Sequence, residues 1–443
     1  AQVQVSGPRL PPSCAPPSSY SAKGRGDRGP PTVAMQRMLL QRSFSKCCAG
    51  TSCVGRASFS SMNASVLPHI NGRMAMQTID IPRPKAGEVL VKNRACGVCH
   101  TDLHIIRGDI AFPTPCVMGH ETCGEIVELG PGVSMSASGS SGAALANELR
   151  VGDPVVTTFI MPCGYCPMCV GNNEDICETF FNQNRLKGGL YDGETRMFFP
   201  DGSPLHQYSM GGMAEYSVLP AFAAYRMPKE VVDMGTDTAI VGCALFTAYG
   251  AVKNAAQIQP GMRVAVFGAG GVGMNVMQIC RAFGAAEVIA VDLDRSKLDF
   301  AKSCMGATQI VDARASADVV AEVKSHTPFG RGVDVAFEVV GSPVTFDQAV
   351  SAVGDGGKAV MVGLTKLGTR GSVDITRMVR RKITVQGSFG AKARSDTPVI
   401  LDMLKRGVLS LESISKRYTL DQAADAFEDL EAGKIMGKAV VEF

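Results

Sequence analysis

Apolar and polar residues follow two different patterns along the chain, and each pattern predicts its own kind of fold. Between about residues 82 and 242, short β-type runs such as EVLVKNRACGV, EIVELG and PVVTTFI are separated by Gly, Pro and Asp turns, which is typical of a β-rich module. Beyond Gly242, helical stretches alternate with the apolar strands RVAVFGAGG, EVIAVDLD, ATQIVDA, VDVAFEVVG, KAVMVGL and ITVQGSFG. This alternation predicts a parallel sheet with crossover helices. The expected fold class is therefore α/β, with a doubly wound parallel sheet beside a β-rich domain.

Two further stretches complete the pattern. From about Ser388 the chain carries the helical run TPVILDMLKRG and ends on the strand-like KAVVEF. The segment VSMSASGSSGAALANELRVGD is rich in Ser, Gly and Ala and predicts an exposed loop. No uncharged apolar run approaches the ~18 residues that a membrane-spanning helix needs, so we expect no membrane partner.

The first part of the chain has a different composition. After Asp27 no acidic residue occurs before Asp80, while Arg and Lys recur in a stretch rich in Ser and in small or apolar residues. This composition is typical of an organelle transit peptide, and a disordered tail is the alternative. We therefore expect residues 35–74 to be a transit peptide and linker, with a mitochondrial location or, as the alternative, a chloroplast one. Residues 1–34 are expected to be an upstream segment before a start at Met35; an intact native precursor that begins at Ala1 would contradict this.

Length and charge restrict the class of protein. The 443 residues are enough for about two to three domains with a proper core. Lys and Arg number 44 against 41 Asp and Glu, a formal net charge of +3. Such a balance provides no basic surface for following a phosphate backbone, so nucleic acid is not expected as a partner.

A glycine-rich turn predicts a dinucleotide site. The strand RVAVF runs into Gly268, Gly270 and Gly273 in the spacing G-x-G-x-x-G, and a helical pattern follows. The first glycine permits a tight turn, the second lets the backbone approach a pyrophosphate, and the third lets helix and strand pack closely. The N-terminus of the following helix offers free N–H groups to the phosphates.

Asp292 indicates which dinucleotide is bound. It ends the strand EVIAVD, nineteen residues beyond Gly273, where a carboxylate can accept hydrogen bonds from the adenosine ribose. Because a carboxylate repels a 2′-phosphate, we expect NAD rather than NADP.

Four closely spaced cysteines predict a structural zinc site. Cys163, Cys166, Cys169 and Cys177 form a C-x2-C-x2-C-x7-C array whose thiolates can close a tetrahedron around the metal. An iron–sulfur motif also begins C-x2-C-x2-C, but its next cysteine follows after three residues and precedes Pro. A zinc knuckle for nucleic acid is a further alternative, which the balanced charge disfavours.

The segment CGVCHTDLHIIRGDIAFPTPCVMGHE allows two interpretations. Cys96 and Cys99 could be a redox pair, but such a pair begins a helix within a βαβ unit, and here it follows a strand-like run. Alternatively, Cys99 and His120 combine with the distant Cys243 as three zinc ligands, and the fourth position stays open for water or substrate. That arrangement is the catalytic kind, and we prefer it.

These motifs together resemble a known family. GVCHTDLHIIRGDIAFPTPCVMGHE, the four-cysteine loop, GCALFTAYGA and GAGGVG followed by VDLDRSK are similar to the zinc-dependent alcohol dehydrogenases of the medium-chain dehydrogenase/reductase superfamily. The resemblance runs from about Arg83 to the C-terminus. It is strongest to the long plant and animal forms, which include the glutathione-dependent formaldehyde dehydrogenases. It implies a GroES-like catalytic domain (75–244 and 388–443), a Rossmann domain (245–387), an active site between them, and a homodimer.

The resemblance also assigns roles to individual residues. Cys99, His120 and Cys243 match the catalytic zinc ligands, and Glu121 matches an acidic residue that can approach the metal. Asp102 matches the carboxylate that orients the ligating histidine, and Thr101 and His104 match the two ends of a proton relay. Toward the cofactor, Lys297 matches a group near the adenosine ribose and His100 an Arg that binds the pyrophosphate, while Phe159 matches the aromatic wall of the substrate pocket. Cys96, Cys116 and Cys123 are expected in the core.

The implied chemistry is the interconversion of alcohols and aldehydes or ketones. A zinc-bound alkoxide forms because zinc lowers the pKa of the hydroxyl, its proton leaves through Thr101, the cofactor ribose and His104, and hydride passes to NAD. The expectation is two zinc ions per chain, one catalytic and one structural, and a small alcohol or aldehyde as substrate. Three alternatives stay open: an S-hydroxymethyl glutathione dehydrogenase, a zinc-free reductase of enals or quinones, and a non-catalytic protein that binds zinc and NAD.

Overall fold

The protein's structure, a computed structural model, describes residues 60–133 and 148–443. The predicted upstream segment, the predicted transit peptide as far as residue 59 and most of the Ser-rich insert lie outside the described residues.

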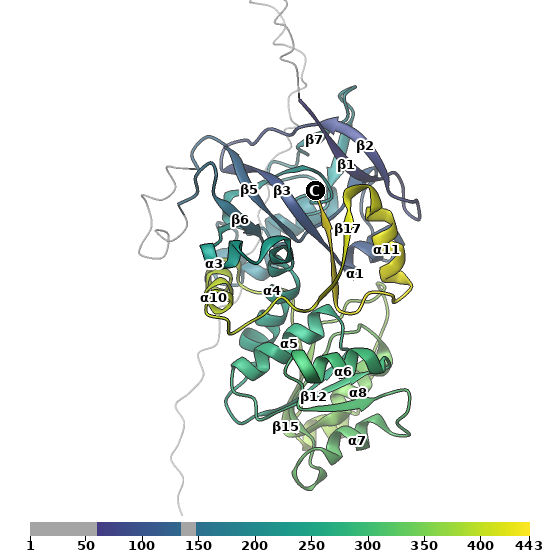
Figure 1. Ribbon diagram of the computed structural model, residues 1–443. Coiled ribbons are helices and arrows are strands. Elements are labelled where there is room, and N and C mark those ends of the chain that lie inside the picture. Colours follow the sequence, from purple (N-terminus) through teal and green to yellow (C-terminus); the bar gives the residue numbers. More distant parts are fainter. Residues whose placement is uncertain (1–59, 134–147) are drawn as a thin grey trace, which may run out of the picture. The chain divides into compact units, whose positions relative to one another are not determined.

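The predicted parallel sheet is present and has six strands in the order β13-β12-β11-β14-β15-β16. Its strands are β11 (Arg263–Phe267), β12 (Glu287–Asp292), β13 (Gln309–Asp312), β14 (Val333–Glu338), β15 (Val353–Met361) and β16 (Thr384–Gly387). The crossover helices are α5 (Gly271–Ala282), α6 (Arg295–Cys304), α7 (Val319–Ser325), α8 (Pro343–Ala352) and α9 (Ile375–Arg380). The central strands are buried almost throughout, as expected where helices cover both faces of a parallel sheet. Figure 1 shows this region in green, with α5, α6 and α8 beside β12 and β15.

The β-rich module contains a seven-stranded sheet centred on β3. Its strands are β3 (Glu88–Val98), β5 (Thr122–Leu129), β6 (Pro154–Thr157), β9 (Tyr216–Pro220), β10 (Ala224–Arg226), β17 (Ile414–Thr419) and β18 (Lys438–Glu442). β18 pairs with β3 so that Ala439 lies opposite Val98. The C-terminal segment, drawn in yellow in Figure 1, therefore returns to the β-rich module and carries Lys438 next to Val98, the last residue of β3.

A second sheet of the module contains the first described strand. Its five strands are β1 (Ser61–Leu67), β2 (Ala75–Asp80), β4 (Cys116–Val117), β7 (Met197–Phe198) and β8 (Pro204–Gln207). β1 pairs with both β2 and β4, and its Ala64, Val66 and Leu67 are buried. The prediction of a linker as far as residue 74 is therefore wrong for this strand, because its alternating apolar residues belong to the core.

The remaining elements connect the sheets and carry several site residues. The helices are α1 (His100–Ile106), α2 (Pro167–Val170), α3 (Lys229–Val232), α4 (Ala244–Gly250), α10 (Ala393–Lys405) and α11 (Ala423–Glu431). Residues Phe180–Arg185 and Ala251–Ala256 form π-helical turns, and Glu174–Ile176, Ala221–Ala223, Gly235–Gly242, Pro328–Gly330 and Leu420–Gln422 form 3₁₀ turns. Within the described ranges no single helix is long and apolar enough to cross a membrane, and one bent pair, Gly235–Gly242 with Ala244–Ala256, meets the length and composition requirement.

Candidate active site

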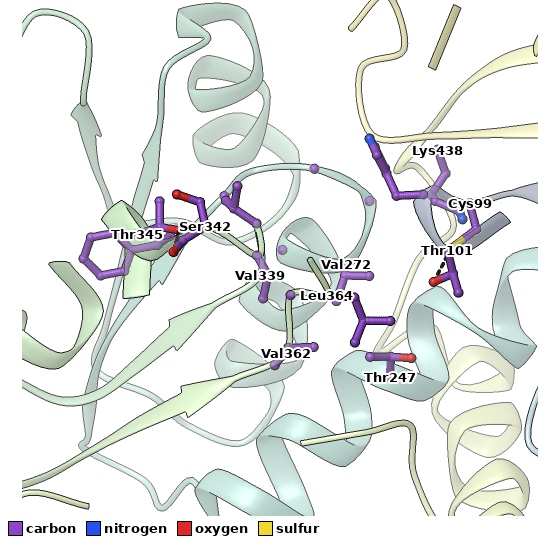
Figure 2. Close-up of a pocket in the computed structure, with 18 of the residues that line it drawn as sticks. Cys99, Thr101, Thr247, Val272, Val339, Ser342, Thr345, Val362, Leu364 and Lys438 are labelled. Atoms are coloured by element: carbon purple, nitrogen blue, oxygen red, sulfur yellow. Dashed lines mark hydrogen bonds between the residues drawn. The ribbon is translucent and has the colours of Figure 1, made fainter. Parts of the chain in front are cut away.

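A cavity of about 750 Å³ lies where the parallel sheet faces the β-rich module. Figure 2 shows Val339, Ser342 and Thr345 on one side of it and Cys99, Thr101 and Lys438 on the other. The wall formed by the sheet includes the segments that follow β11, β12, β14 and β15. This is the carboxyl end of the parallel strands, where open α/β sheets bind ligands.

The glycine loop after β11 has the close contacts that its sequence predicts. Gly268 has a φ of +108°, a conformation that side chains disfavour. A Cβ atom at Gly273 would lie 1.8 Å from the carbonyl oxygen of Gly268, whereas a Cβ at Gly270 would meet nothing within 4 Å. At Gly273 the first turn of α5 therefore packs tightly against the loop, and at Gly270 the backbone is open on the side where a Cβ would lie. This shape fits a pyrophosphate.

The carboxylate of Asp292 lies at the end of β12 and faces this loop. Its Oδ2 accepts a hydrogen bond of 2.6 Å from the Ala269 N–H, and its Oδ1 accepts one of 2.9 Å from the Asp294 N–H. Lys297, half-buried on α6, and His100, exposed at the start of α1, also line the cavity. All six residues predicted to bind the cofactor thus line one cavity: Gly268, Gly270, Gly273, Asp292, Lys297 and His100.

Cys99, His120, Glu121 and Cys243 converge in the opposite wall, and their ligand atoms all lie within 4.8 Å of one another. Each of them stands at the end of an element: Cys99 precedes α1, His120 and Glu121 precede β5, and Cys243 precedes α4. The Sγ of Cys243 lies 3.5 Å from Nε2 of His120. Two thiols and one imidazole are the soft and borderline donors that zinc prefers, so the residues present fit this metal.

Asp102 orients the histidine of the cluster. Its buried Oδ1 lies 3.1 Å from Nδ1 of His120 and accepts a hydrogen bond of 3.3 Å from the Gly119 N–H. With Nδ1 engaged in this way, Nε2 is the nitrogen that points toward the thiols.

The side chains of the cluster shift one another's pKa values. The hydrogen bond from the Cys243 thiol holds the pKa of Cys99 well below its usual range, and that of Cys243 is raised. Burial alone would lower the pKa of His120, but Asp102 and Cys99 together raise it to about 10. The pocket thus concentrates negative charge, which a divalent cation would neutralise.

Lys438 is a member of this site that the sequence reasoning missed. Its ammonium donates a hydrogen bond of 2.5 Å to Oε1 of Glu121 and one of 2.9 Å to the carbonyl of Val98. Burial by itself would lower the pKa of Lys438, but the negative charges of Glu121, Cys99 and Cys243 raise it. Burial raises the pKa of Glu121 to about 7 against the opposing effect of Lys438.

The side chain of Lys438 needs room beside the cofactor loop. A Cβ at Gly271 would lie 2.4 Å from Cδ of Lys438, so this glycine admits the lysine stem against the first turn of α5. Lys438 therefore connects the carboxylate behind the metal cluster with the loop that faces the dinucleotide.

Replacing Lys438 by Met is expected to lower the free energy of unfolding by about 3–5 kcal/mol, because the buried carboxylate of Glu121 loses its cation. Urea unfolding of the metal-loaded variant measures this loss. The double variant Lys438→Met, Glu121→Gln removes both charges and is expected to recover most of the lost stability. A single variant as stable as the wild type, or a double variant no more stable than the single, would contradict a stabilising role for the pair.

The second cluster consists of Cys163, Cys166, Cys169 and Cys177, whose sulfur atoms also lie within 4.8 Å of one another. Two of the Sγ–Sγ distances are 3.9 and 4.0 Å, close to the about 3.8 Å edge of a tetrahedron with zinc–sulfur distances of 2.3 Å. Backbone N–H groups of Cys163, Cys166 and Cys169 each donate to another sulfur of the cluster, and Phe180 N–H donates to Cys177. All four thiols are buried, so the cluster has no open side and fits a structural zinc.

The relay candidates lie on α1, at the edge of the cavity. Thr101 is half-buried, and its Oγ1 lies 3.7 Å from the Sγ of Cys99. Nδ1 of His104 lies 3.0 Å from Oδ2 of Asp109. Both Thr101 and His104 line the cavity, the first next to the metal cluster and the second half-buried further along the helix.

Aromatic rings form the substrate end of the cavity. Phe159 lies on the cavity wall, with ring centroids 5.9 Å from His120 and 5.4 Å from Phe389. Tyr208, which sequence reasoning did not single out, packs its ring 5.7 Å from His120. The wall beside the metal cluster is therefore largely apolar.

The redox interpretation of Cys96 and Cys99 finds no support in the structure. Cys96 is buried in β3, and its thiol lies 3.6 Å from the carbonyl oxygen of Gly97. Cys116 and Cys123 are buried as expected, and the described cysteines are all free.

Comparison with known proteins identifies the family. Residues 85–229 match the alcohol dehydrogenase GroES-like domain, and residues 271–406 match the zinc-binding dehydrogenase domain. The alcohol dehydrogenase class-3 of Cereibacter sphaeroides is 30% identical over 387 residues, and the match covers 83% of this chain and 98% of the relative. The S-(hydroxymethyl)glutathione dehydrogenase of Paracoccus denitrificans is 29% identical, with 83% and 96% covered.

Solved structures agree with this assignment. An alcohol dehydrogenase zinc-binding domain protein from Burkholderia ambifaria matches with a TM-score of 0.78 and 30% identity, over 87% of this chain and 99% of that one. The benzyl alcohol dehydrogenase from Acinetobacter calcoaceticus matches with a TM-score of 0.77 and 29% identity over the same shares. A zinc-binding dehydrogenase from Sinorhizobium meliloti bound to NADP matches with a TM-score of 0.69 and 25% identity, over 87% of this chain and 100% of that one.

The relatives contradict the predicted location. The curated relatives named above come from bacteria and match over nearly their whole length, and bacterial cells contain neither mitochondria nor chloroplasts. The prediction of a mitochondrial or chloroplast location is therefore wrong. Scattered Arg and Ser with few acidic residues is a composition that other N-terminal segments share with targeting peptides.

The fold, the donor sets and the matches lead to one conclusion. The chain belongs to the zinc-dependent alcohol dehydrogenases of the medium-chain dehydrogenase/reductase superfamily, enzymes that interconvert alcohols and carbonyl compounds with zinc and a nicotinamide cofactor.

Proposed function

We propose that this chain is an NAD-dependent alcohol dehydrogenase that holds two zinc ions, one catalytic and one structural. Cys99, His120 and Cys243 line the same cavity as the glycine loop, and this juxtaposition carries the proposal. In this arrangement an alcohol oxygen at the zinc and the nicotinamide of a bound cofactor would lie within reach of each other in one cavity.

Cys99, Cys243 and His120 would hold the catalytic zinc. A zinc ion with three protein ligands lowers the pKa of a hydroxyl group and polarises a carbonyl group. Asp102 keeps Nε2 of His120 directed at the cluster through the 3.1 Å contact at Nδ1. Lys438 keeps Glu121 in an ion pair, which leaves the three other donors as the ligand set. Phe159 borders the space where the carbon chain of the substrate would lie.

Cys163, Cys166, Cys169 and Cys177 would hold the structural zinc. Four thiolates leave no position for substrate, and the buried cluster does not line the cavity. Its role would be to fix the loop that precedes the π-helical turn Phe180–Arg185.

Asp292 supports NAD as the cofactor. Its carboxylate is half-buried at the cavity wall, where it would accept hydrogen bonds from ribose hydroxyls and repel a 2′-phosphate. The relative from Sinorhizobium meliloti is bound to NADP, so a comparison of kcat/KM for NAD and NADP is needed.

Thr101 and His104 are proposed to carry the substrate proton away from the reacting oxygen. Thr101 has its hydroxyl beside Cys99, and the imidazole of His104 is fixed by Asp109. Thr101 would accept the proton and pass it on toward His104, from which it leaves for solvent.

Replacing His104 by Gln is expected to lower kcat for alcohol oxidation by about 100-fold, the lower end of the usual range for losing one proton-transfer group. Imidazole added to the buffer is expected to restore part of the rate, because a free base can replace the missing side chain. His69→Gln is the matched control, since His69 is exposed and lies outside the cavity lining. A His104 variant with unchanged kcat, or a loss that imidazole does not rescue, would remove His104 from the relay.

The central test is NADH formation by the zinc-loaded full-length chain with a series of primary alcohols. We expect turnover that a chelator abolishes and added zinc restores, two zinc ions per chain by elemental analysis, and a higher kcat/KM with NAD than with NADP. Turnover that survives complete removal of zinc would contradict the proposed mechanism.

A second candidate function is dehydrogenation of the glutathione adduct of formaldehyde. The relatives named S-(hydroxymethyl)glutathione dehydrogenase favour it, so formaldehyde with glutathione belongs in the same series of substrates. The predicted homodimer stays a prediction, which the mass in solution would decide.

A further inference from the structure

Arg185 places a positive charge in the substrate end of the cavity. It ends the π-helical turn Phe180–Arg185 and lines the same cavity as Cys99, His120 and Cys243. π-Helical turns often occur at functional sites. Neither the metal clusters, the cofactor loop nor the relay involves this residue.

Three aromatic rings surround the guanidinium. Its central carbon lies 4.0 Å from the ring centroid of Tyr208, 5.0 Å from that of Phe180 and 5.6 Å from that of Phe159. The faces of aromatic rings attract a cation, but they do not provide acceptors in the plane of the guanidinium, where its N–H groups point.

The charge of Arg185 has no carboxylate partner in the described part of the chain. Its Nη1 is buried there without a hydrogen-bond partner, and none of the ion pairs between described residues includes it. Arg185 as a whole is half-buried, but a buried N–H group without an acceptor is costly. An anion that enters the cavity would supply the missing acceptor.

The position of Arg185 is fixed by a buried network next to it in the chain. The side-chain amide of Asn184 donates to the carbonyls of Gly189 and Ser209 at 3.0 and 2.9 Å, and its Oδ1 accepts from the Ser209 N–H at 2.9 Å. The hydroxyl of Ser209 donates to the carbonyl of Phe159 at 2.7 Å. The segments that carry Arg185, Tyr208 and Phe159 are therefore tied together.

The same rings connect Arg185 with the metal cluster. The Tyr208 centroid lies 5.7 Å from the His120 ring and 4.0 Å from the guanidinium carbon. Together, these two distances put the guanidinium carbon at most about 10 Å from the centroid of the His120 ring. A small molecule can span such a gap, with one end at the cluster and the other at Arg185.

We infer that the preferred alcohol or aldehyde of this enzyme carries a carboxylate, and that Arg185 binds this group as a specificity-determining residue. The planar guanidinium can bind both oxygens of a carboxylate, while Phe159, whose ring lines the cavity, contacts the apolar part between the two ends. The inference deepens the proposed function and rests on it. The expected substrates have a hydroxymethyl or aldehyde group separated from the carboxylate by about one benzene ring or a short alkyl chain.

Matched substrate pairs test the inference with the zinc-loaded full-length chain. The pairs are benzyl alcohol with 4-(hydroxymethyl)benzoate, and 1-hexanol with 6-hydroxyhexanoate. We expect a kcat/KM at least about 10-fold higher for the carboxylated member of a pair, because a hydrogen bond between charged groups contributes about 10- to 100-fold in binding.

Variants then locate the preference. Arg185→Gln is expected to lower the ratio of carboxylated to neutral kcat/KM by about 10- to 100-fold, mainly through KM. Arg185→Lys keeps the charge without the planar fork and is expected to give an intermediate ratio. Lys187→Gln is the matched control, because this exposed cation two residues away lies outside the cavity lining; it should leave the ratio unchanged.

The wild-type ratio alone can overturn the inference, whether or not a variant folds. A wild-type enzyme that oxidises neutral alcohols as well as their carboxylated partners, or better, contradicts the role of Arg185 and leaves the proposed function intact. An Arg185→Gln variant that loses activity equally toward both members contradicts it too, since the arginine then only shapes the pocket. No turnover of any alcohol by zinc-loaded, folded protein would overturn the proposed function together with the inference.

Discussion

Replacing Cys243 by Ala is expected to remove one of the two zinc ions proposed for each chain and to lower kcat/KM for alcohol oxidation by at least about 1000-fold. Among the described residues, the Sγ of Cys243 belongs to a cluster of four potential donors, and Glu121, the fourth, is held by Lys438. A bound metal contributes several kcal/mol to a step that develops charge on oxygen, and each 1.36 kcal/mol changes the rate tenfold. Elemental analysis and steady-state kinetics measure the two effects on one preparation.

Cys280→Ala is the matched control for this variant. Cys280 is as buried as Cys243, but it lies in α5 away from both clusters. The control makes the same chemical change in a core position and is expected to keep both metals and nearly all activity. Full activity in Cys243→Ala, or an equal loss in Cys280→Ala, would mean that Cys243 is not a catalytic ligand.

Local sequence patterns predicted most of the fold, because the elements concerned are specified locally. EVLVKNRACGV coincides with β3, and RVAVF with β11. Alternation of strands and helices leaves few arrangements other than a parallel sheet. For the residues of β1 the sequence predicts a linker instead, because the preceding residues resemble a targeting peptide in composition and the pairing with β2 and β4 is not visible in the sequence.

The catalytic metal cluster could be predicted although its residues are distant in the chain, because each of them lies in a specific motif. Cys99, His120 and Cys243 come from separate segments that the sequence alone cannot bring together, and family resemblance supplied that link. The structure places them within 4.8 Å of one another. The spacing of the four-cysteine loop, in contrast, already restricts its sulfur atoms to one small volume.

Lys438 and Arg185 could not be predicted from local patterns. A lysine at the start of a C-terminal strand and an arginine near two glycines are both typical of exposed surface. Lys438 reaches Glu121, 317 positions away in the chain, only because β18 pairs with β3. Arg185 reaches the cavity only because the π-helical turn and the Asn184 network set its direction. Tertiary contacts therefore determine both positions.

Replacing Cys177 by Ser is expected to lower the melting temperature by at least about 10 °C, because the four-cysteine loop loses its metal. Burial raises the pKa of the Cys177 thiol to about 11, so without a cation this thiol would stay protonated in the folded loop. The loop also holds Glu174, whose Oε1 accepts a 2.7 Å hydrogen bond from the Arg394 N–H at the start of α10. Local unfolding of the loop would therefore remove this hydrogen bond from the start of α10.

Differential scanning calorimetry and elemental analysis test this last expectation together. Cys304→Ser is the matched control, because Cys304 is exposed and lies outside both clusters. We expect the control to keep two zinc ions and the wild-type melting temperature, and Cys177→Ser to keep only the zinc of the open cluster at temperatures below its transition. A Cys177→Ser protein with one zinc and unchanged melting temperature would contradict a structural role for the second metal. A Cys177→Ser protein that keeps two zinc ions would show that the other three thiols hold the structural zinc without Cys177.

The activity of this variant separates the two metal sites. Because Cys177 does not line the cavity, kcat/KM per folded molecule should fall much less in Cys177→Ser than in Cys243→Ala. This contrast distinguishes a metal that stabilises the fold from one that takes part in the reaction.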